Sequence, residues 1–119
     1  MKIVAIVQAR MGSSRLPGKV LKEINGMPMI QILLERLKLS KRIDEVVVAT
    51  TKADSDNTLV DFLKSKNYLY ARGDETNVLE RYIQVAEEFK ADIVVRITGD
   101  CPIIDPMLVD FVIDEFFST

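Results

Sequence analysis

The sequence predicts an α/β fold in three layers, a mainly parallel sheet with helices on both faces. Short apolar runs rich in β-branched residues alternate with segments whose apolar residues recur at helical spacing. No internal repeat, low-complexity tract or linker interrupts this alternation, and 119 residues suit one domain, residues 1–119. Such alternation is typical of a parallel sheet wrapped by helices.

Four segments have the composition of strands. Residues 2–8, 45–51 and 92–97 are apolar runs of the kind expected in strands buried on both faces, and residues 68–71 form a shorter extended piece. With right-handed crossovers and winding in both directions from the first strand, the order is third, second, first, fourth. The first and fourth strands are then neighbours, and their carboxyl ends meet in one crevice.

Four segments have helical periodicity, and a long loop precedes the first. Pro28 opens the first helix, residues 57–66 form the second, Asn77 caps the third with Glu80 three residues on, and Asp105 caps the last. The residues expected to face the core are Ile30, Leu33, Leu34 and Leu37, then Leu59, Val60 and Leu63, then Leu79, Tyr82, Ile83, Ala86 and Phe89, and finally Val109, Val112, Ile113 and Phe116.

The composition excludes several kinds of chemistry. There is no histidine, which excludes Ser-His-Asp and Cys-His mechanisms and histidine-ligated metals. Cys101 is the single cysteine and cannot form an intramolecular disulfide, so the sequence favours the reducing cytoplasm and a small buried role for this residue. The apolar run at residues 3–7 is too short for a signal peptide or a membrane span. Catalysis would use carboxylates, cations, backbone amides or a hard metal ion.

Charge is unevenly distributed, although the formal net charge is only −2. Residues 1–22 hold five cations and no acid, whereas residues 97–119 hold five acids and no base. Most of the cations fall in one loop rather than on an amphipathic face, which favours an anionic ligand. The negative net charge, with no basic stripe between the tyrosines, argues against nucleic acid as a partner.

The loop after the first strand, residues 8–19, is the first candidate site. Its cations are Arg10, Arg15 and Lys19, and its glycines and serines let the backbone turn tightly with its amides exposed. Arginine grips two phosphate oxygens and lysine is a compact point charge, so the set suits a triphosphate. The alternative is a solvated surface loop.

Other phosphate motifs fit this loop poorly. The Walker pattern has closer glycines and follows its lysine with Ser or Thr. Here Gly12 and Gly18 are separated by five residues, and Lys19 is followed by Val20, which cannot bind magnesium. No Gly-x-Gly-x-x-Gly of the dinucleotide-binding kind follows the first strand.

The turn after the fourth strand is the second candidate site. Asp100 follows that strand directly, so its carboxylate is expected beside the phosphates at the switch point of the sheet. Mg²⁺ takes one or two carboxylates and completes its shell with phosphate and water, which suits Asp100 as a ligand. The alternative is that Asp100 caps a turn. Asp105 precedes a proline, which favours a helix cap over a ligand.

Three motifs carry a family resemblance: QARMGSSRLPGKVL at residues 8–21, GMPMI at 26–30 and RITGDCPIIDP at 96–106. Together they resemble the spore coat polysaccharide biosynthesis protein F family, which is similar to CMP-sialic acid and CMP-3-deoxy-manno-octulosonate synthetases. The resemblance covers essentially the whole chain. It implies a Rossmann-like sheet of the nucleotide-diphospho-sugar transferase type. It also implies a cytidylyltransferase that activates a sugar as CMP-sugar, with release of pyrophosphate, for surface or spore coat polysaccharide.

The resemblance also implies site residues. Arg10 and Lys19 are the expected catalytic residues, Asp100 the Mg²⁺ ligand, and CTP and a sugar the substrates. Arg72 and Gly73 match the region that reaches the cytosine in related enzymes, although this segment is also typical of a loop before a capped helix. The implied nucleotide-binding residues are Ala9, Arg10, Met11, Gly12, Ser13, Ser14, Arg15, Lys19, Arg72 and Gly73.

Family members continue well past residue 119, so we expect the amino-terminal part of a longer nucleotidyltransferase. The alternative is a non-catalytic or truncated nucleotide-binding or scaffold domain. The identity of the sugar and the formation of a homodimer are open at this point.

Overall fold

The computed structural model of the chain describes residues 1–12, 18–98 and 105–118. At its centre is a parallel sheet in the order β5-β4-β1-β6. The four strands are β1 (Ile3–Gln8), β4 (Glu45–Thr51), β5 (Leu69–Gly73) and β6 (Ile93–Thr98). This is the predicted order of third, second, first and fourth strand, and it leaves β5 and β6 at the edges.

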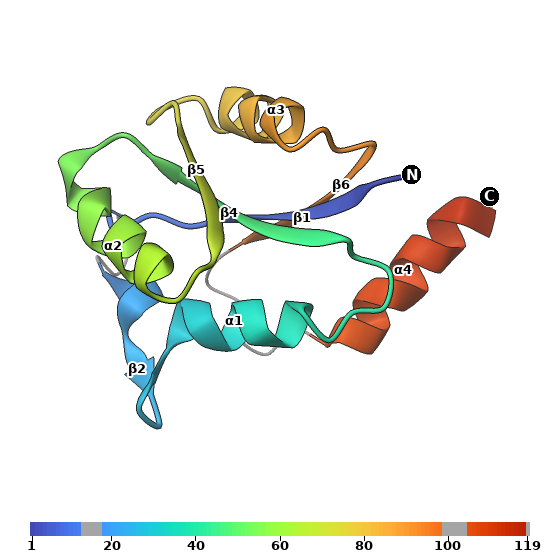
Figure 1. Cartoon of the computed structure of the whole chain (residues 1–119), viewed down its shortest axis with the longest axis horizontal. Coiled ribbons are helices and arrows are strands. Elements are labelled where there is room, and N and C mark those ends of the chain that lie inside the picture. The colour runs from blue at the N-terminus through green and yellow to red at the C-terminus, as the bar shows by residue number, and fades with distance from the viewer. Residues whose placement is uncertain (13–17, 99–104, 119) are drawn as a thin grey trace.

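Strand β1 is buried on both faces, as its composition predicts. Ala5 and Val7 belong to one hydrophobic cluster and Val4 and Ile6 to another, because successive side chains of a strand point to opposite faces. Helices α1 (Met29–Leu37) and α2 (Asn57–Ser65) pack on the first cluster, and α3 (Val78–Glu88) packs on the second. Figure 1 shows the resulting three layers, with α3 on one side of the sheet and α1 and α2 on the other.

Local capping follows the sequence closely. The Asn77 side chain accepts the Glu80 amide at 2.9 Å and caps α3. The Asp105 carboxylate accepts the Met107 amide at 2.9 Å at the start of α4 (Pro106–Ser118), as predicted. Pro28 differs slightly from its prediction, since it occupies the cap position before α1 rather than the first helical position.

The region predicted as one long loop before α1 contains a short hairpin. Strands β2 (Glu23–Ile24) and β3 (Met27–Pro28) pair antiparallel. Asn25 and Gly26 form the turn between them, with φ angles of 53° and 82°. Positive φ at both central residues of a two-residue turn is what Asn-Gly favours. The hairpin therefore has a local signal in the sequence, although the prediction of a single loop did not include it.

The buried face of α3 is rotated from the predicted one. Leu79 and Ile83, both predicted to face the core, are 64% and 43% exposed, whereas Arg81 and Val85, which were not predicted to do so, are buried. The prediction is confirmed for Tyr82, which is buried, and for Ala86 and Phe89, which pack against the same cluster. The predicted face followed the most apolar residues, but the path of the chain after β5 turns the Arg81 side toward the sheet. The apolar residues of a helical pattern form the buried face only when that side of the helix packs against the rest of the molecule.

Helix α4 exposes much of its apolar surface. Val112 and Phe116, both predicted to face the core, are 58% and 63% exposed, whereas Ile113 is buried and Val109 is partly buried. The helix lies beside the edge strand β6, so only part of its surface meets the rest of the molecule (Figure 1). Within the described ranges, no helix is both long and apolar enough to cross a membrane.

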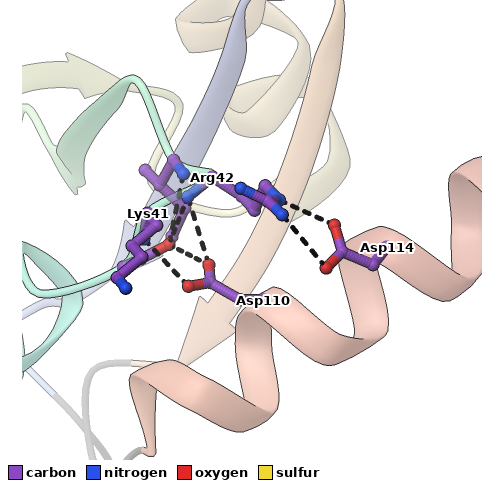
Figure 2. A network of polar contacts seen from close by, with 6 residues as sticks. Lys41, Arg42, Asp110 and Asp114 are labelled. Atoms are coloured by element: carbon purple, nitrogen blue, oxygen red, sulfur yellow. Dashed lines mark hydrogen bonds and ion pairs between the residues drawn. The ribbon is translucent and has the colours of Figure 1, made fainter.

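Polar contacts hold α4 to the loop after α1. Figure 2 shows Asp110 and Asp114 directed toward the segment that carries Lys41 and Arg42. Asp110 accepts the Lys41 amide at 2.8 Å, the Arg42 amide at 3.2 Å and the Ser40 hydroxyl. Arg42 Nε donates to Asp114 Oδ1 at 2.7 Å. Burial alone would raise the pKa of Asp110, but these hydrogen bonds outweigh it and hold the pKa below its ordinary value of 3.8.

We expect Asp110→Asn to lower the free energy of unfolding by about 1 kcal/mol at neutral pH, because the amide nitrogen cannot accept the bonds that the carboxylate accepts. The matched variant Asp114→Asn removes one exposed ion pair and should have a smaller effect. Since the folded-state pKa of Asp110 is lowered, its stabilising effect is present above pH 3.8 and is lost as the pH falls through the folded-state pKa. Urea unfolding of the wild type and both variants at pH 7 and pH 3 measures the loss of stability and its pH dependence. Equal losses of stability in the two variants would contradict the role of Asp110 in holding α4.

Candidate functional site

A cavity of about 250 Å³ lies at the carboxyl edge of the sheet. Its lining comes from the last residue of β4 and from the segments that follow β1, β4 and β5, namely Arg10, Gly12, Thr51, Ala53, Ser55, Asp56, Glu75 and Thr76. A second cavity of about 240 Å³, lined in part by Leu34, Glu45 and Leu69, lies at the amino ends of β4 and β5 and holds none of the predicted site residues. The first cavity is therefore the candidate site, since ligands of parallel sheets bind at the carboxyl ends of the strands.

Asp56 joins two of the loops that form the cavity. This residue ends the short 3-10 helix η2 (Asp54–Asp56) and is only 1% exposed. Its Oδ1 accepts the Met11 amide at 2.6 Å, and its Oδ2 accepts the Thr51 hydroxyl. The Thr51 hydroxyl oxygen in turn accepts the Ala53 amide at 3.2 Å. The loop after β1 is thus tied to the loop after β4 through one buried carboxylate.

The start of the loop after β1 is well defined. The Ala9 amide donates to the Ala49 carbonyl at 3.1 Å, and Ala9 is 3% exposed. Gly12 lies near Ser55, because a Cβ on Gly12 would be 3.9 Å from the serine Oγ. Arg10 lies between these anchored points, with an exposed side chain on the cavity wall. Among the described residues it has no hydrogen-bond or ion-pair partner, so its guanidinium is available to a ligand.

The two ends of the predicted phosphate loop come together. The Gly18 amide donates to the Met11 carbonyl at 2.8 Å, and Gly18 has a φ of 77°, which favours glycine. Lys19 begins the 3-10 helix η1 (Lys19–Leu21), so its backbone is placed close to the start of the loop. Ser13, Ser14, Arg15, Asp100 and Cys101 lie outside the described residues, as does the side chain of Lys19.

Arg72 contacts the backbone of the loop after β4. Its Nε donates to the Thr51 carbonyl at 2.7 Å, and its Nη2 donates to the Ala53 carbonyl at 2.9 Å. These two bonds hold the backbone of Thr51 and Ala53, two residues of the cavity wall. The cytosine contact expected of Arg72 stays a prediction, and a guanidinium fixed in this way would approach a base with its remaining donors.

Gly73 ends β5 where α3 comes very close. A Cβ on Gly73 would lie 2.7 Å from Gln84 Oε1 and 3.0 Å from Arg81 Cγ. A side chain at this position requires the flexible end of Gln84 to move aside and Arg81 to shift by a few tenths of an ångström, so α3 packs tightly on the sheet at this point. Gly73 therefore serves the packing of α3 against the sheet, and its predicted contact with nucleotide stays a prediction.

Sequence reasoning missed three residues of this region: Thr51, Asp56 and Arg81. The signal for Asp56 was present, since an acid soon after a core strand was the same signal that singled out Asp100. Arg81 gave no signal, because an arginine in an amphipathic helix is typical of the solvent face.

We expect Asp56→Asn to lower the free energy of unfolding by about 1–3 kcal/mol, because the buried carboxylate accepts two bonds that an amide accepts only in part. Asp54→Asn changes an exposed acid of the same short helix and should be close to neutral. Urea denaturation of both variants and the wild type measures the difference. Similar stabilities for the two variants would show that Asp56 does not hold the loops together.

Comparison with known proteins agrees with the predicted resemblance. A family model described as cytidylyltransferase matches residues 4–118. The spore coat polysaccharide biosynthesis protein SpsF of Bacillus subtilis is 39% identical over 120 residues, which cover 98% of this chain and 50% of the relative. The family resemblance is thereby confirmed over almost the full chain.

Two solved structures confirm the predicted fold. A cytidylyltransferase from Leptospira borgpetersenii has a TM-score of 0.94 and 39% identity, covering 100% of this chain and 50% of that one. A CMP:2-keto-3-deoxy-manno-octonic acid synthetase complexed with CTP has a TM-score of 0.85 and 32% identity, covering 99% and 48%. The chain spans about half the length of the proteins that it matches. By its sequence and its fold, the chain belongs to the cytidylyltransferase family.

Proposed function

We propose that this chain binds CTP with Mg²⁺ at the carboxyl edge of its sheet, as the nucleotide-binding part of an enzyme that transfers CMP to a sugar. The observation that carries the proposal is Arg10, an unpaired cation among the described residues, on a loop held in place by Asp56 at the cavity. The similar synthetase of known structure was solved with CTP, which supports this choice of nucleotide.

The triphosphate is assigned to the cations of the loop after β1. Arg10 offers a planar fork for two phosphate oxygens, and Lys19 and Arg15 add charge from the same loop. The closure of this loop through the Gly18 and Met11 backbones supports the assignment, because it brings the backbone of Lys19 near that of Arg10. The base and ribose are assigned to the backbone around Ala9 and to the loops that follow β4 and β5.

Charge determines the proposed mechanism. A sugar hydroxyl attacks the α-phosphorus in line, its oxygen forms the new bond and its proton passes to water. The bond to pyrophosphate breaks with its electron pair on the leaving oxygen. Negative charge therefore grows on the leaving group, where Arg10 and Lys19 would stabilise it. Positioning and charge stabilisation are sufficient for this chemistry, so the lack of histidine is no obstacle.

Magnesium is assigned to Asp100. Within the described parts of the chain, no group of three or more His, Cys, Asp or Glu side chains could hold a metal ion. A single carboxylate suits Mg²⁺, because this ion completes its shell with phosphate and water oxygens. When bound, the ion would offset part of the charge of the triphosphate.

The sugar and the pathway are proposed from the relatives. The similarity to the SpsF protein favours surface or spore coat polysaccharide, and the synthetase of known structure is named for an acidic sugar, 2-keto-3-deoxy-manno-octonic acid. We propose a sugar of this class as the acceptor of CMP.

We expect CTP with Mg²⁺ to raise the melting temperature by about 4 °C or more at a saturating concentration, because a ligand that binds only the folded state stabilises it. UTP, GTP and ATP under the same conditions are the controls, and they should give smaller shifts. A thermal-shift series measures this directly. No shift with any of the four nucleotides would favour a scaffold domain that has kept the fold without the site.

We expect Arg10→Ala and Lys19→Ala each to lower pyrophosphate release from CTP by on the order of 10²-fold while the fold is kept, because each removes one stabilising charge. Lys64→Ala, at an exposed position near the end of α2, is the control for loss of one cation. The measurement is pyrophosphate release with a panel of acidic sugars, with circular dichroism to verify folding. Near-normal rates in both loop variants would contradict the assigned role.

A further inference from the structure

The side chain of Arg81 is buried without a partner among the described residues. It is 1% exposed, and it is among the largest fully buried side chains in the described part of the chain. None of its Nε, Nη1 and Nη2 atoms has a hydrogen-bond partner there. A guanidinium stays charged in proteins and carries five N–H donors, and buried polar groups are nearly always paired. Arg81 therefore needs an explanation beyond the packing of α3.

The acids near Arg81 are already engaged. Asp56 accepts the Met11 amide and the Thr51 hydroxyl, and Asp74 Oδ1 accepts the amides of Thr76 and Asn77, both at 2.8 Å. Both carboxylates attract Arg81 through space without forming a hydrogen bond to it. Each of these carboxylates is therefore held by bonds to the loops of the cavity and not by a bond to Arg81.

The other charge near Arg81 is a second cation, Arg10. Burial lowers the pKa of Arg81, and the positive charge of Arg10 lowers it further. Arg10 and Asp56 both line the cavity, so the Arg81 guanidinium lies within electrostatic range of the cavity wall. Asp56 and Glu75 also line this cavity, but neither forms a described ion pair with the two arginines. Two cations without an ion-pair partner, close to one cavity, favour an oxygen-bearing anion.

The position of Arg81 is built into the fold. Its amide donates to the Asn77 carbonyl at 3.1 Å in the first turn of α3, whose cap is held by the Asn77 side chain. On the sheet side, a Cβ on Gly73 would lie 3.0 Å from Arg81 Cγ and 3.4 Å from Arg81 Cα. A side chain at Gly73 would therefore press on Arg81, which packs tightly against the end of β5.

We propose that Arg81 is a ligand-binding residue of this cavity, which pairs with an oxygen acceptor of the nucleotide bound beside Arg10. The proposal rests on the proposed function for the identity of the ligand as a nucleotide. The oxygen comes from the phosphate chain or from the base, and the charge of the neighbouring Arg10 favours phosphate. The guanidinium nitrogens are covered, so contact requires a neighbouring side chain to shift. Arg10, exposed and without a described partner, has that freedom.

The central variant is Arg81→Met, which keeps much of the side-chain length and removes the charge. Without nucleotide, we expect its melting temperature to rise by about 4 °C, because replacing an unpaired buried charge by an apolar side chain is stabilising. With CTP and Mg²⁺, we expect its affinity by calorimetry to fall about 10-fold or more. A residue with a merely structural role would not give higher stability together with weaker binding.

Arg96→Met is the matched control. The Arg96 guanidinium is exposed and stacks 4.4 Å from the ring of Tyr82, the residue after Arg81 on α3. This variant removes the same charge close to the same helix, and its CTP affinity should stay near that of the wild type. Arg81→Lys is the second variant, because it keeps the positive charge and loses the planar guanidinium that can bind two oxygens at once. We expect its CTP affinity to fall about 10-fold as well.

Tripolyphosphate identifies the source of the oxygen. Weaker binding of both CTP and tripolyphosphate by Arg81→Met assigns the contact to the phosphate chain, and weaker binding of CTP alone assigns it to the nucleoside. Wild-type affinity for both ligands in Arg81→Met overturns the proposal. If Arg81→Met does not unfold cooperatively, Arg81→Lys decides in the same way.

The same series separates this inference from the proposed function. A wild-type protein that binds tripolyphosphate but no nucleotide contradicts the proposed function. In that case, loss of tripolyphosphate binding in Arg81→Met still supports an anion contact at Arg81, and unchanged binding overturns it.

Discussion

The candidate site depends on one buried carboxylate. Asp56 accepts the backbone amide of Met11 and the hydroxyl of Thr51, so it sets the position of the loop after β1 relative to the end of β4. The parallel sheet brings these strand ends to one edge, but pairing alone does not determine where a loop of glycines and serines leads. The bond to Asp56 does so at Met11, next to Arg10. The reach of Arg10 into the cavity follows from this constraint.

Three arginines lie in or near the cavity, each in a different setting. Gly73 lets α3 approach the sheet, and the approach buries the guanidinium of Arg81 near Arg10. Arg72, from the same strand as Gly73, instead directs two donors to the loop after β4. The three arginines therefore differ in environment. Arg72 bonds the backbone of the cavity wall, Arg10 is exposed on the wall, and Arg81 is buried within electrostatic range of it.

Much of the fold could be predicted from the sequence, because it depends on local patterns and general rules. The strand order follows from three core-like strands, right-handed crossovers and winding in both directions. The caps at Asn77 and Asp105 could be predicted because each bonds a backbone amide only two or three residues away. The hairpin at Asn25 and Gly26 is equally local, and its Asn-Gly signal is present in the sequence although a plain loop was predicted there.

The sequence by itself determined the fold class, the strand order and the cationic character of the loop after β1, since these depend on residue types and short-range spacing. Only the tertiary structure decided that Arg81 is buried while Leu79 is exposed, and that Asp56 holds the amide of Met11, 45 residues away. Both outcomes depend on how separate segments pack against the sheet. Neither follows from spacing along the chain, because burial and long-range hydrogen bonds are properties of surfaces that exist only after folding.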